Sequence, residues 1–169
     1  MRDNKLSEKG GVLLKIITAI ILFLLATPAI ASDEQQCLQE AIYFEARSEG
    51  SIGMLAVGIV IKNRMLSGKY PGTYCGVVRQ GYYRSGNPIK GMCQFSYWCD
   101  GKHERPNEEK SWLSAGNIAR LVMTTNIIIE GMEGATHYHA RYVSPDWSQS
   151  HRKLARIGQH IFYEEPSAN

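Results

Sequence analysis

The segment from Ile52 to Leu66 constrains the fold more than any other, because it is apolar on nearly every side when it is read as a helix. A surface helix shows one apolar stripe, whereas a helix that is apolar all round is buried. Ser51 is placed to cap its start, and Gly68 follows its polar end, Lys62-Asn63-Arg64. The glycines at positions 50, 53 and 58 allow a neighbour to approach closely. The sequence therefore predicts a central helix around which the other elements pack.

Two further helices are predicted around this centre. Apolar residues at helical spacing indicate helices over residues 37–47 and 108–130. Residues 69–106 read as a long irregular region, in which Val77-Val78 forms a short helix or strand. A long loop region inside a compact domain is usually functional.

The C-terminal part carries the pattern of strands. Residues 136–140 and 157–163 alternate, which predicts a hairpin-like pair of extended segments with a loop at 143–147. We find no internal repeat and no second domain. The predicted fold class is α+β, mostly helical.

Residues 1–31 have the pattern of a secretory signal peptide. Basic residues precede an apolar run from Ile16 to Ala26, and Ala29-Ile30-Ala31 predicts cleavage before Ser32. The run is shorter than the ~20 residues of a spanning helix. The alternative is an uncleaved membrane anchor that starts at Val12. We expect a cleaved signal peptide, export to the periplasm or cell envelope, and one domain over residues 32–169.

The charge balance excludes one class of partner. The chain has 19 basic and 16 acidic residues, a net charge of +3. The leader holds four basic and two acidic residues, which leaves fifteen basic, fourteen acidic and a net charge of +1 in the rest. A nearly neutral domain lacks the basic stripe of a nucleic-acid binder. We expect no nucleic-acid partner, membrane contact only through the N-terminal segment, and a monomer.

The four cysteines all follow the leader, at Cys37, Cys75, Cys93 and Cys99. An even number in an exported chain indicates disulfides, for which three connectivities exist. The short spacing favours Cys93–Cys99, which leaves Cys37–Cys75. A zinc site with four cysteine ligands is the alternative, but no Cys-x-x-Cys spacing supports it.

Glu45 is the first candidate for chemistry. Leu38, Ala41, Ile42 and Glu45 stand at i, i+3, i+4 and i+7, so this carboxylate shares a helical face with apolar residues. Burial raises the pKa of a carboxylate, and a Glu that stays protonated near pH 7 is suited to general acid catalysis. Spacing alone favours the ordinary interpretation, in which Glu45 lies at the edge of the face and reaches water.

A glycosidase usually pairs such an acid with a second carboxylate. Glu49, Asp100 and Asp146 are the candidates, and none is selected by spacing. A lytic transglycosylase needs no second carboxylate, because one Glu protonates the leaving oxygen and then removes a proton from the sugar's own hydroxyl.

The bridged segment Cys93 to Cys99 has two interpretations. It is a stapled surface loop whose aromatic side chains fill the core beneath, or it is a wall of a sugar-binding groove. The groove interpretation selects Gln94, Phe95 and Ser96 as substrate-binding residues, together with Tyr138 and Trp147.

The pair His137 and His139 supports a competing hypothesis. Two histidines on one strand face are metal ligands in many zinc enzymes, and His160 or Asp146 is the candidate third ligand. Such a site predicts a zinc-dependent amidase or endopeptidase. A His-x-His pair alone is weak evidence, so we expect no metal and no cofactor. A third hypothesis is a non-catalytic wall-binding domain.

The chain resembles the spore-cortex-lytic enzyme (SleB/CwlJ) family of cell-wall hydrolases from Cys37 to Tyr163. Four blocks in the family's order carry the resemblance: residues 41–50 with Glu45-Ala46-Arg47-Ser48-Glu49, residues 53–64, residues 93–101, and residues 135–147 followed by 157–162. One departure is Thr136-His137-Tyr138-His139, where many relatives have an aromatic run rich in Asn and Pro. We expect no separate repeat-type wall-binding domain.

The resemblance implies a small lysozyme-like or lytic-transglycosylase-like α+β domain. It implies cleavage of peptidoglycan between N-acetylmuramic acid and N-acetylglucosamine, with 1,6-anhydromuramic ends. The family's catalytic acid carries over to Glu45, and Glu49 becomes a supporting group.

Overall fold

The computed structural model describes residues 28–102 and 105–166. The chain divides into two compact units, Met1–Asp33 and Glu34–Asn169, and the following concerns the second. Apart from its last four positions, the predicted signal peptide lies outside the described residues, so the leader and its anchor alternative stay predictions. None of the described helices has the length and apolar character to cross a membrane.

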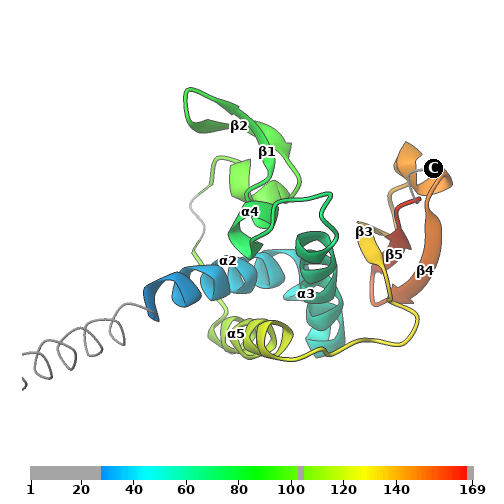
Figure 1. The fold of residues 1–169 in the computed structure, drawn as a ribbon, viewed down its shortest axis with the longest axis horizontal. Coiled ribbons are helices and arrows are strands. Elements are labelled where there is room, and N and C mark those ends of the chain that lie inside the picture. Colours follow the sequence, from blue (N-terminus) through cyan, green and yellow to red (C-terminus); the bar gives the residue numbers. More distant parts are fainter. Residues whose placement is uncertain (1–27, 103–104, 167–169) are drawn as a thin grey trace, which may run out of the picture. The chain divides into compact units, whose positions relative to one another are not determined.

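The unit combines helices with two small antiparallel sheets (Figure 1), which confirms the predicted α+β class. The helices are α2 (Pro28–Ala46), α3 (Gly50–Leu66), α4 (Tyr74–Val78) and α5 (Glu109–Thr124), with 3₁₀ turns η1 (Ser96–Cys99) and η2 (Asp146–Gln149). The strands are β1 (Gly81–Arg84), β2 (Asn87–Cys93), β3 (Ala135–Ala140), β4 (Arg152–Ile157) and β5 (His160–Glu164).

Helix α3 is the centre of the fold, as its apolar sequence predicts. Every residue from Gly53 to Ile61 is buried. At Gly58 the neighbouring helices come so close that a Cβ atom would lie 3.0 Å from Val122 and 3.1 Å from Ile42. Glycine at this position therefore lets α2 and α5 pack directly against α3.

The opposite side of α3 packs against the C-terminal sheet, whose strand order is β3-β5-β4. Ala56 and Val60 of α3 form a second core cluster with Met132, Ala135 and Phe162. Tyr138 of β3 pairs with Phe162 of β5. Helix α3 thus connects the helical core to the sheet, and both cores depend on it.

Three predicted helix boundaries are wrong. Helix α2 already includes the polar lead before Cys37, and α3 begins at Gly50 with Glu49 as its N-cap residue instead of Ser51. Helix α5 ends at Thr124, six residues before the predicted end. Thr125 leaves the helix with extended backbone angles (φ −130°, ψ 165°), and Ile127 and Ile129 then pack against the core from an irregular segment.

The region predicted as irregular contains ordered structure. Val77 and Val78 belong to α4, and β1 and β2 form a hairpin. Ser85 and Gly86, the two residues between its strands, both have positive φ (51° and 81°), as a type I′ turn requires. The Ser-Gly pair beside Tyr82-Tyr83 was the sequence signal for this turn.

The C-terminal segments form three strands where the sequence pattern predicted two. Residues 157–163 do not form one strand, because Gly158 and Gln159 form a turn between β4 and β5. Gly158 has φ of 57°, in the left-handed region that favours glycine. The alternating residues that predicted one strand therefore belong to the end of β4, the turn and β5.

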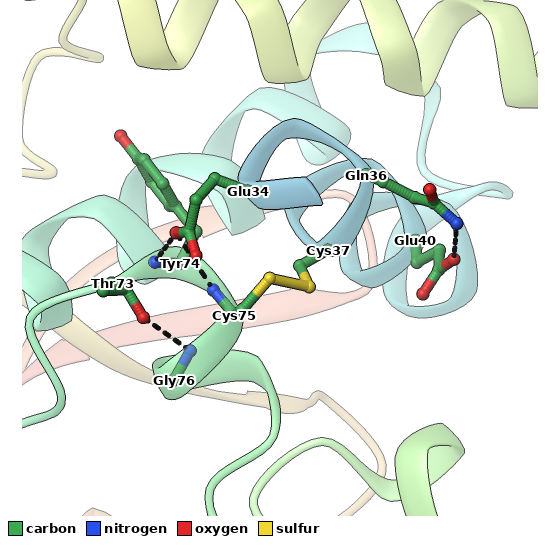
Figure 2. The surroundings of a disulfide bond; sticks show 8 residues. All are labelled: Glu34, Gln36, Cys37, Glu40, Thr73, Tyr74, Cys75 and Gly76. Carbon is green, nitrogen blue, oxygen red and sulfur yellow. Dashed lines mark hydrogen bonds between the residues drawn. A yellow bond between two sulfur atoms is a disulfide. The ribbon is translucent and has the colours of Figure 1, made fainter. Parts of the chain in front are cut away.

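Both disulfides match the preferred pairing. Cys37–Cys75 connects α2 to α4 with a Cα–Cα distance of 5.1 Å, and Cys93–Cys99 closes the short loop at 6.1 Å. Figure 2 shows that Glu34 reinforces the first bridge: its Oε2 accepts hydrogen bonds from the backbone N–H groups of Tyr74 (2.6 Å) and Cys75 (3.3 Å). The start of α4 is therefore held to α2 by one covalent and two polar contacts.

Candidate functional site

A cleft of about 460 Å³ brings the predicted groove residues together with Glu45. Helix α2 contributes Glu45, the bridged loop contributes one wall, and β3 with the segment after it contributes the other. The lining residues are Phe44, Glu45, Arg64, Gln94, Phe95, Ser96, Tyr97, His137, Tyr138, His139, Ala140, Tyr142, Val143, Trp147 and His160. Segments 100 residues apart in sequence thus meet at one carboxylate.

Glu45 lies where the apolar face of α2 reaches the cleft. Leu38, Ala41 and Ile42 are fully buried on this face, and Glu45 is partly buried one turn further on. Burial raises the pKa of Glu45 above its ordinary value of 4.5. The Tyr138 hydroxyl donates a 3.0 Å hydrogen bond to Glu45 Oε2, and this bond lowers the pKa in the opposite direction.

Arg64 is a buried cation in the same cleft, with only 5% of its surface exposed. Its Nε donates a 2.6 Å hydrogen bond to the Thr136 carbonyl oxygen. The guanidinium lies over the rings of Tyr70 (5.2 Å) and Phe95 (5.6 Å). Its charge favours the ionised form of Glu45. From the sequence, Arg64 was predicted only to lie in the polar end of an otherwise apolar helix. A charged residue at the end of a buried helix was the available sign that Arg64 could be buried at a site.

The bridged loop both fills the core and lines the cleft; whether it binds sugar stays a prediction. Phe95 and Tyr97 are buried (2% and 6% exposed), and Tyr97 stacks on Phe44 with ring centroids 4.9 Å apart. Gln94 and Ser96, which alternate with them, are exposed at the cleft. Aromatic side chains therefore anchor the loop in the core while polar side chains face the groove.

The opposite wall is centred on Trp147. Its ring contacts His137 and His139 at centroid distances of 5.1 and 5.6 Å, which confirms that both histidines share a strand face. Tyr142 and Val143 line the cleft with highly exposed side chains (82% and 47%). Sequence reasoning passed over Tyr142, because an exposed aromatic residue in a loop has no periodicity to reveal it.

The histidines do not form a three-ligand metal site. Among the described residues, no group of three His, Cys, Asp or Glu side chains has a metal-binding arrangement. His139 has both ring nitrogens in 3.0 Å contacts, Nδ1 with the Ala140 carbonyl and Nε2 with the Tyr163 hydroxyl. Burial, followed by the charges of Arg64 and His151, lowers the pKa of His137 to about 4. His137 is therefore neutral at pH 7.

His160, the candidate third ligand, lies on β5 with its ring edge-on to Tyr138 at 5.1 Å. The residue is buried, and its Nδ1 has no hydrogen-bond partner among the described residues. His160 lines the cleft with the rest of its ring, while Nδ1 itself is buried.

The three candidate second carboxylates are not among the lining residues. Glu49 instead joins the α2–α3 corner to the β4–β5 turn, where its Oε2 accepts a 2.7 Å hydrogen bond from the Gln159 N–H. Asp100 pairs with Lys102 at 3.3 Å, and Asp146 begins η2. Of the residues that the structure describes, Glu45 is the one carboxylate that lines the cleft.

Comparison with solved structures finds the same fold in two bacterial catalytic domains. The catalytic domain of the Bacillus cereus SleB protein is 25% identical, with a TM-score of 0.58 over 79% of this chain and 91% of that one. The catalytic domain of the germination-specific lytic transglycosylase SleB from Bacillus anthracis is 24% identical, with a TM-score of 0.59 over 83% and 98%. These matches confirm the predicted fold.

Sequence comparison agrees with the structural one. The spore cortex-lytic enzyme of Halalkalibacterium halodurans is 29% identical over 141 residues, or 80% of this chain. The chain spans 36% of that relative's length. The family model of the cell wall hydrolases matches residues 48–163, which is more than half of the sequence. The chain therefore belongs to the cell wall hydrolase family.

Proposed function

We propose that this chain cleaves the glycan strands of peptidoglycan as a lytic transglycosylase, with Glu45 acting first as acid and then as base. The observation that carries the proposal is a single partly buried carboxylate in a cleft lined by aromatic and polar side chains. The names of the relatives, a spore cortex-lytic enzyme and a germination-specific lytic transglycosylase, support the same chemistry.

In the first step, protonated Glu45 donates its proton to the glycosidic oxygen between N-acetylmuramic acid and N-acetylglucosamine. The bond from C1 of the muramic residue to this oxygen breaks, and positive charge develops at C1. The raised pKa of Glu45 keeps a fraction of the enzyme in the acid form that this step requires.

In the second step, the Glu45 carboxylate accepts the proton of the muramic 6-hydroxyl. The hydroxyl oxygen attacks C1, a 1,6-anhydro ring forms, and Glu45 is again protonated. No water enters the product, so no second carboxylate is needed to activate one. This agrees with Glu45 being the one described carboxylate at the cleft.

Tyr138 and Arg64 suit the change of role between the two steps. The Tyr138 hydroxyl donates to Oε2, which leaves Oε1 as the oxygen that carries the transferred proton. Arg64 contributes a fixed positive charge that favours the carboxylate once the proton has left. Burial is the largest effect and raises the pKa of Glu45 above its ordinary value, while these two groups act in the opposite direction and limit the rise.

The rest of the cleft suits a neutral sugar chain. Exposed Tyr142 and half-buried Trp147 offer ring faces, and Gln94 and Ser96 offer hydrogen-bonding groups. The predicted leader and the two disulfides support export, with the protein acting in the periplasm or cell envelope. We expect it to act there as a monomer.

Product analysis tests the proposal. Purified protein lacking residues 1–31 is incubated with sacculi, and the released muropeptides are analysed by mass spectrometry. We expect 1,6-anhydromuramic ends. Reducing ends would identify a muramidase, cleaved peptide bonds that disappear on chelation would identify a zinc hydrolase, and bound protein without any product would identify a wall-binding domain. Each of these three results contradicts the transglycosylase.

Tyr138→Phe tests the proposed hydrogen bond through the pH profile. Removing a donor that favours the carboxylate raises the pKa of Glu45 further, so the alkaline limb of the kcat/KM profile moves to higher pH. We expect kcat to fall roughly tenfold, because the carboxylate of the second step loses a charge-assisted bond.

Tyr163→Phe is the matched control for this profile. It removes a hydroxyl that bonds His139 Nε2 and has no bond to Glu45. The alkaline limb of this control should stay at the wild-type pH. A Tyr138→Phe profile that also stays there would show that Tyr138 does not tune Glu45.

A further inference from the structure

The hairpin of β1 and β2 carries exposed aromatic and basic side chains that the proposed chemistry does not use. Tyr82, Tyr83 and Met92 are 68%, 45% and 49% exposed, and Arg84 and Lys90 are exposed beside them. We call four of them, Tyr82, Arg84, Lys90 and Met92, the arm surface. Figure 1 shows the hairpin extending away from α2, α3 and α5. Exposed aromatic residues flanked by cations are typical of a binding surface.

The base of the hairpin is rigidly held. The Trp98 Nε1–H donates to the Tyr83 hydroxyl (3.0 Å), which donates in turn to the Arg79 carbonyl oxygen (2.6 Å). The Arg79 guanidinium lies 4.8 Å from the centre of the Trp98 ring. The Cys93–Cys99 bridge ties the end of β2 to η1. The arm surface is therefore presented in one orientation, which reduces the entropy lost on binding.

Positive charge is concentrated in the hairpin and the residues on either side of it. Residues 79–102 contain Arg79, Arg84, Lys90 and Lys102 against a single acid, Asp100, a net charge of +3. Residues 32–169 have a net charge of +1, so the other residues of this range together carry −2. Among the described residues, neither Arg84 nor Lys90 has an ion pair within 4.0 Å. Lys90 does interact electrostatically with Asp100, so its charge is partly compensated, while the exposed charge of Arg84 is available to an anionic ligand.

The hairpin leads directly into a wall of the cleft. Strand β2 ends at Cys93, and the next three residues, Gln94, Phe95 and Ser96, line the cleft. A polymer bound along this wall therefore passes the base of the hairpin. The glycan strand itself is uncharged in its sugar rings, whereas the short peptides attached to its muramic residues carry free carboxylates and alanine methyl groups.

We propose that the arm surface binds these carboxylate-bearing peptides, so that the protein acts preferentially on peptidoglycan that still carries them. Arg84 and Lys90 attract the carboxylates, and Tyr82 and Met92 cover the apolar parts of the peptide. Tyr83 points to the opposite face of β1 and holds the hairpin through Trp98 and Arg79. The inference rests on the proposed function for its choice of polymer. It adds a second point of recognition outside the cleft.

The test compares two double variants with the same change of charge. Arg84→Ser with Lys90→Ser removes the arm's cations, and Lys110→Ser with Arg120→Ser removes two exposed cations from α5. All proteins carry Glu45→Gln so that the polymer stays intact. Binding is measured by co-sedimentation with intact sacculi, with chitin as an insoluble, uncharged and peptide-free glycan, and with vesicles that contain anionic phospholipid. Thermal unfolding verifies that each variant is folded.

On intact sacculi we expect the arm variant to bind roughly threefold to tenfold more weakly than its parent, and the α5 variant to bind like the parent. On peptide-free glycan all three should bind alike. As a measurement that needs no arm variant, rising salt should weaken the parent's binding to intact sacculi but not to peptide-free glycan.

Three results would overturn the inference: equal binding of the arm variant and its parent to intact sacculi, an equal loss on peptide-free glycan, or a loss seen only with vesicles containing anionic phospholipid. The last result would assign the arm to a membrane surface. Because binding is measured without turnover, these outcomes are distinct from a failure of the proposed function, which product analysis reports with Glu45 intact.

Discussion

The Glu45→Gln variant is expected to cleave sacculi roughly 10²–10⁴ times more slowly than wild type, the usual range for removing a positioned general acid. Glutamine preserves the shape of the side chain, and its oxygen still accepts the hydrogen bond of Tyr138. It has no proton to donate to the leaving oxygen and no carboxylate to accept one from the 6-hydroxyl. Release of anhydro-muropeptides, followed by mass spectrometry over time, measures the loss.

The same variant should be more stable than wild type at neutral and alkaline pH. The folded-state pKa of Glu45 is raised, so the unfolded chain ionises first as pH rises from about 4.5. The stability that protonated Glu45 contributes is therefore present below pH 4.5 and lost as pH rises through the folded pKa. Glutamine does not ionise and avoids this loss. Thermal unfolding at pH 4 and pH 8 checks the sign.

Glu49→Gln is the matched control, because it makes the same chemical change at the neighbouring carboxylate. Its oxygen can still accept the N–H of Gln159, so we expect activity close to that of wild type. If Glu49→Gln abolished cleavage and Glu45→Gln did not, the assignment of the acid would be wrong.

Removing the Cys37–Cys75 bridge should produce the largest loss of stability. Replacing both cysteines by alanine frees a loop of 38 residues in the unfolded chain. The chain-entropy relation assigns such a loop about 4 kcal/mol at 25 °C. For a domain of this size the midpoint of thermal unfolding should fall by roughly 10–15 °C. Cys37 is buried, so the lost contacts act in the same direction.

Removing Cys93–Cys99 provides the comparison. Its separation of six residues corresponds to about 2 kcal/mol by the same relation, so the thermal shift should be about half as large. Activity, in contrast, should depend more on Cys93–Cys99 than on Cys37–Cys75, because the loop closed by Cys93–Cys99 contains Gln94, Phe95 and Ser96 of the cleft. We expect KM for sacculi to rise with Cys93→Ala/Cys99→Ala and to change little with Cys37→Ala/Cys75→Ala. Equal thermal shifts would contradict the loop-length argument.

Much of the fold could be predicted because local patterns have a direct physical cause. The apolar run of α3 has nowhere to lie except inside the protein, and the structure places it there. The helix predicted to Glu130 shows the limit of such reasoning. Apolar residues after Thr124 do contact the core, but they do so from an irregular segment, which the spacing of apolar residues alone does not distinguish from helix.

The structure brings the residues predicted for the site to one cleft, and their roles in catalysis and substrate binding stay predictions. Glu45, Gln94, Phe95, Ser96, Tyr138 and Trp147 came from an inward helical face, a bridged loop and a family resemblance, and the structure brings all six to one cleft. Arg64 and Tyr142 were missed. Arg64 lies near the end of α3 and Tyr142 follows β3. Both reach the cleft only because these two elements pack together, and local sequence patterns do not reveal that packing.

The sequence by itself determined the central helix, the α+β class and the inward face that carries Glu45, because hydrophobic periodicity acts within one element. Only the tertiary structure decided that Glu45 is the one described carboxylate at the cleft and that Tyr138 and Arg64 bias its protonation. It also decided that Glu49, four residues away, holds a turn of the sheet. Burial and charge at a carboxylate depend on residues distant in sequence, and the chain brings them together only when it folds.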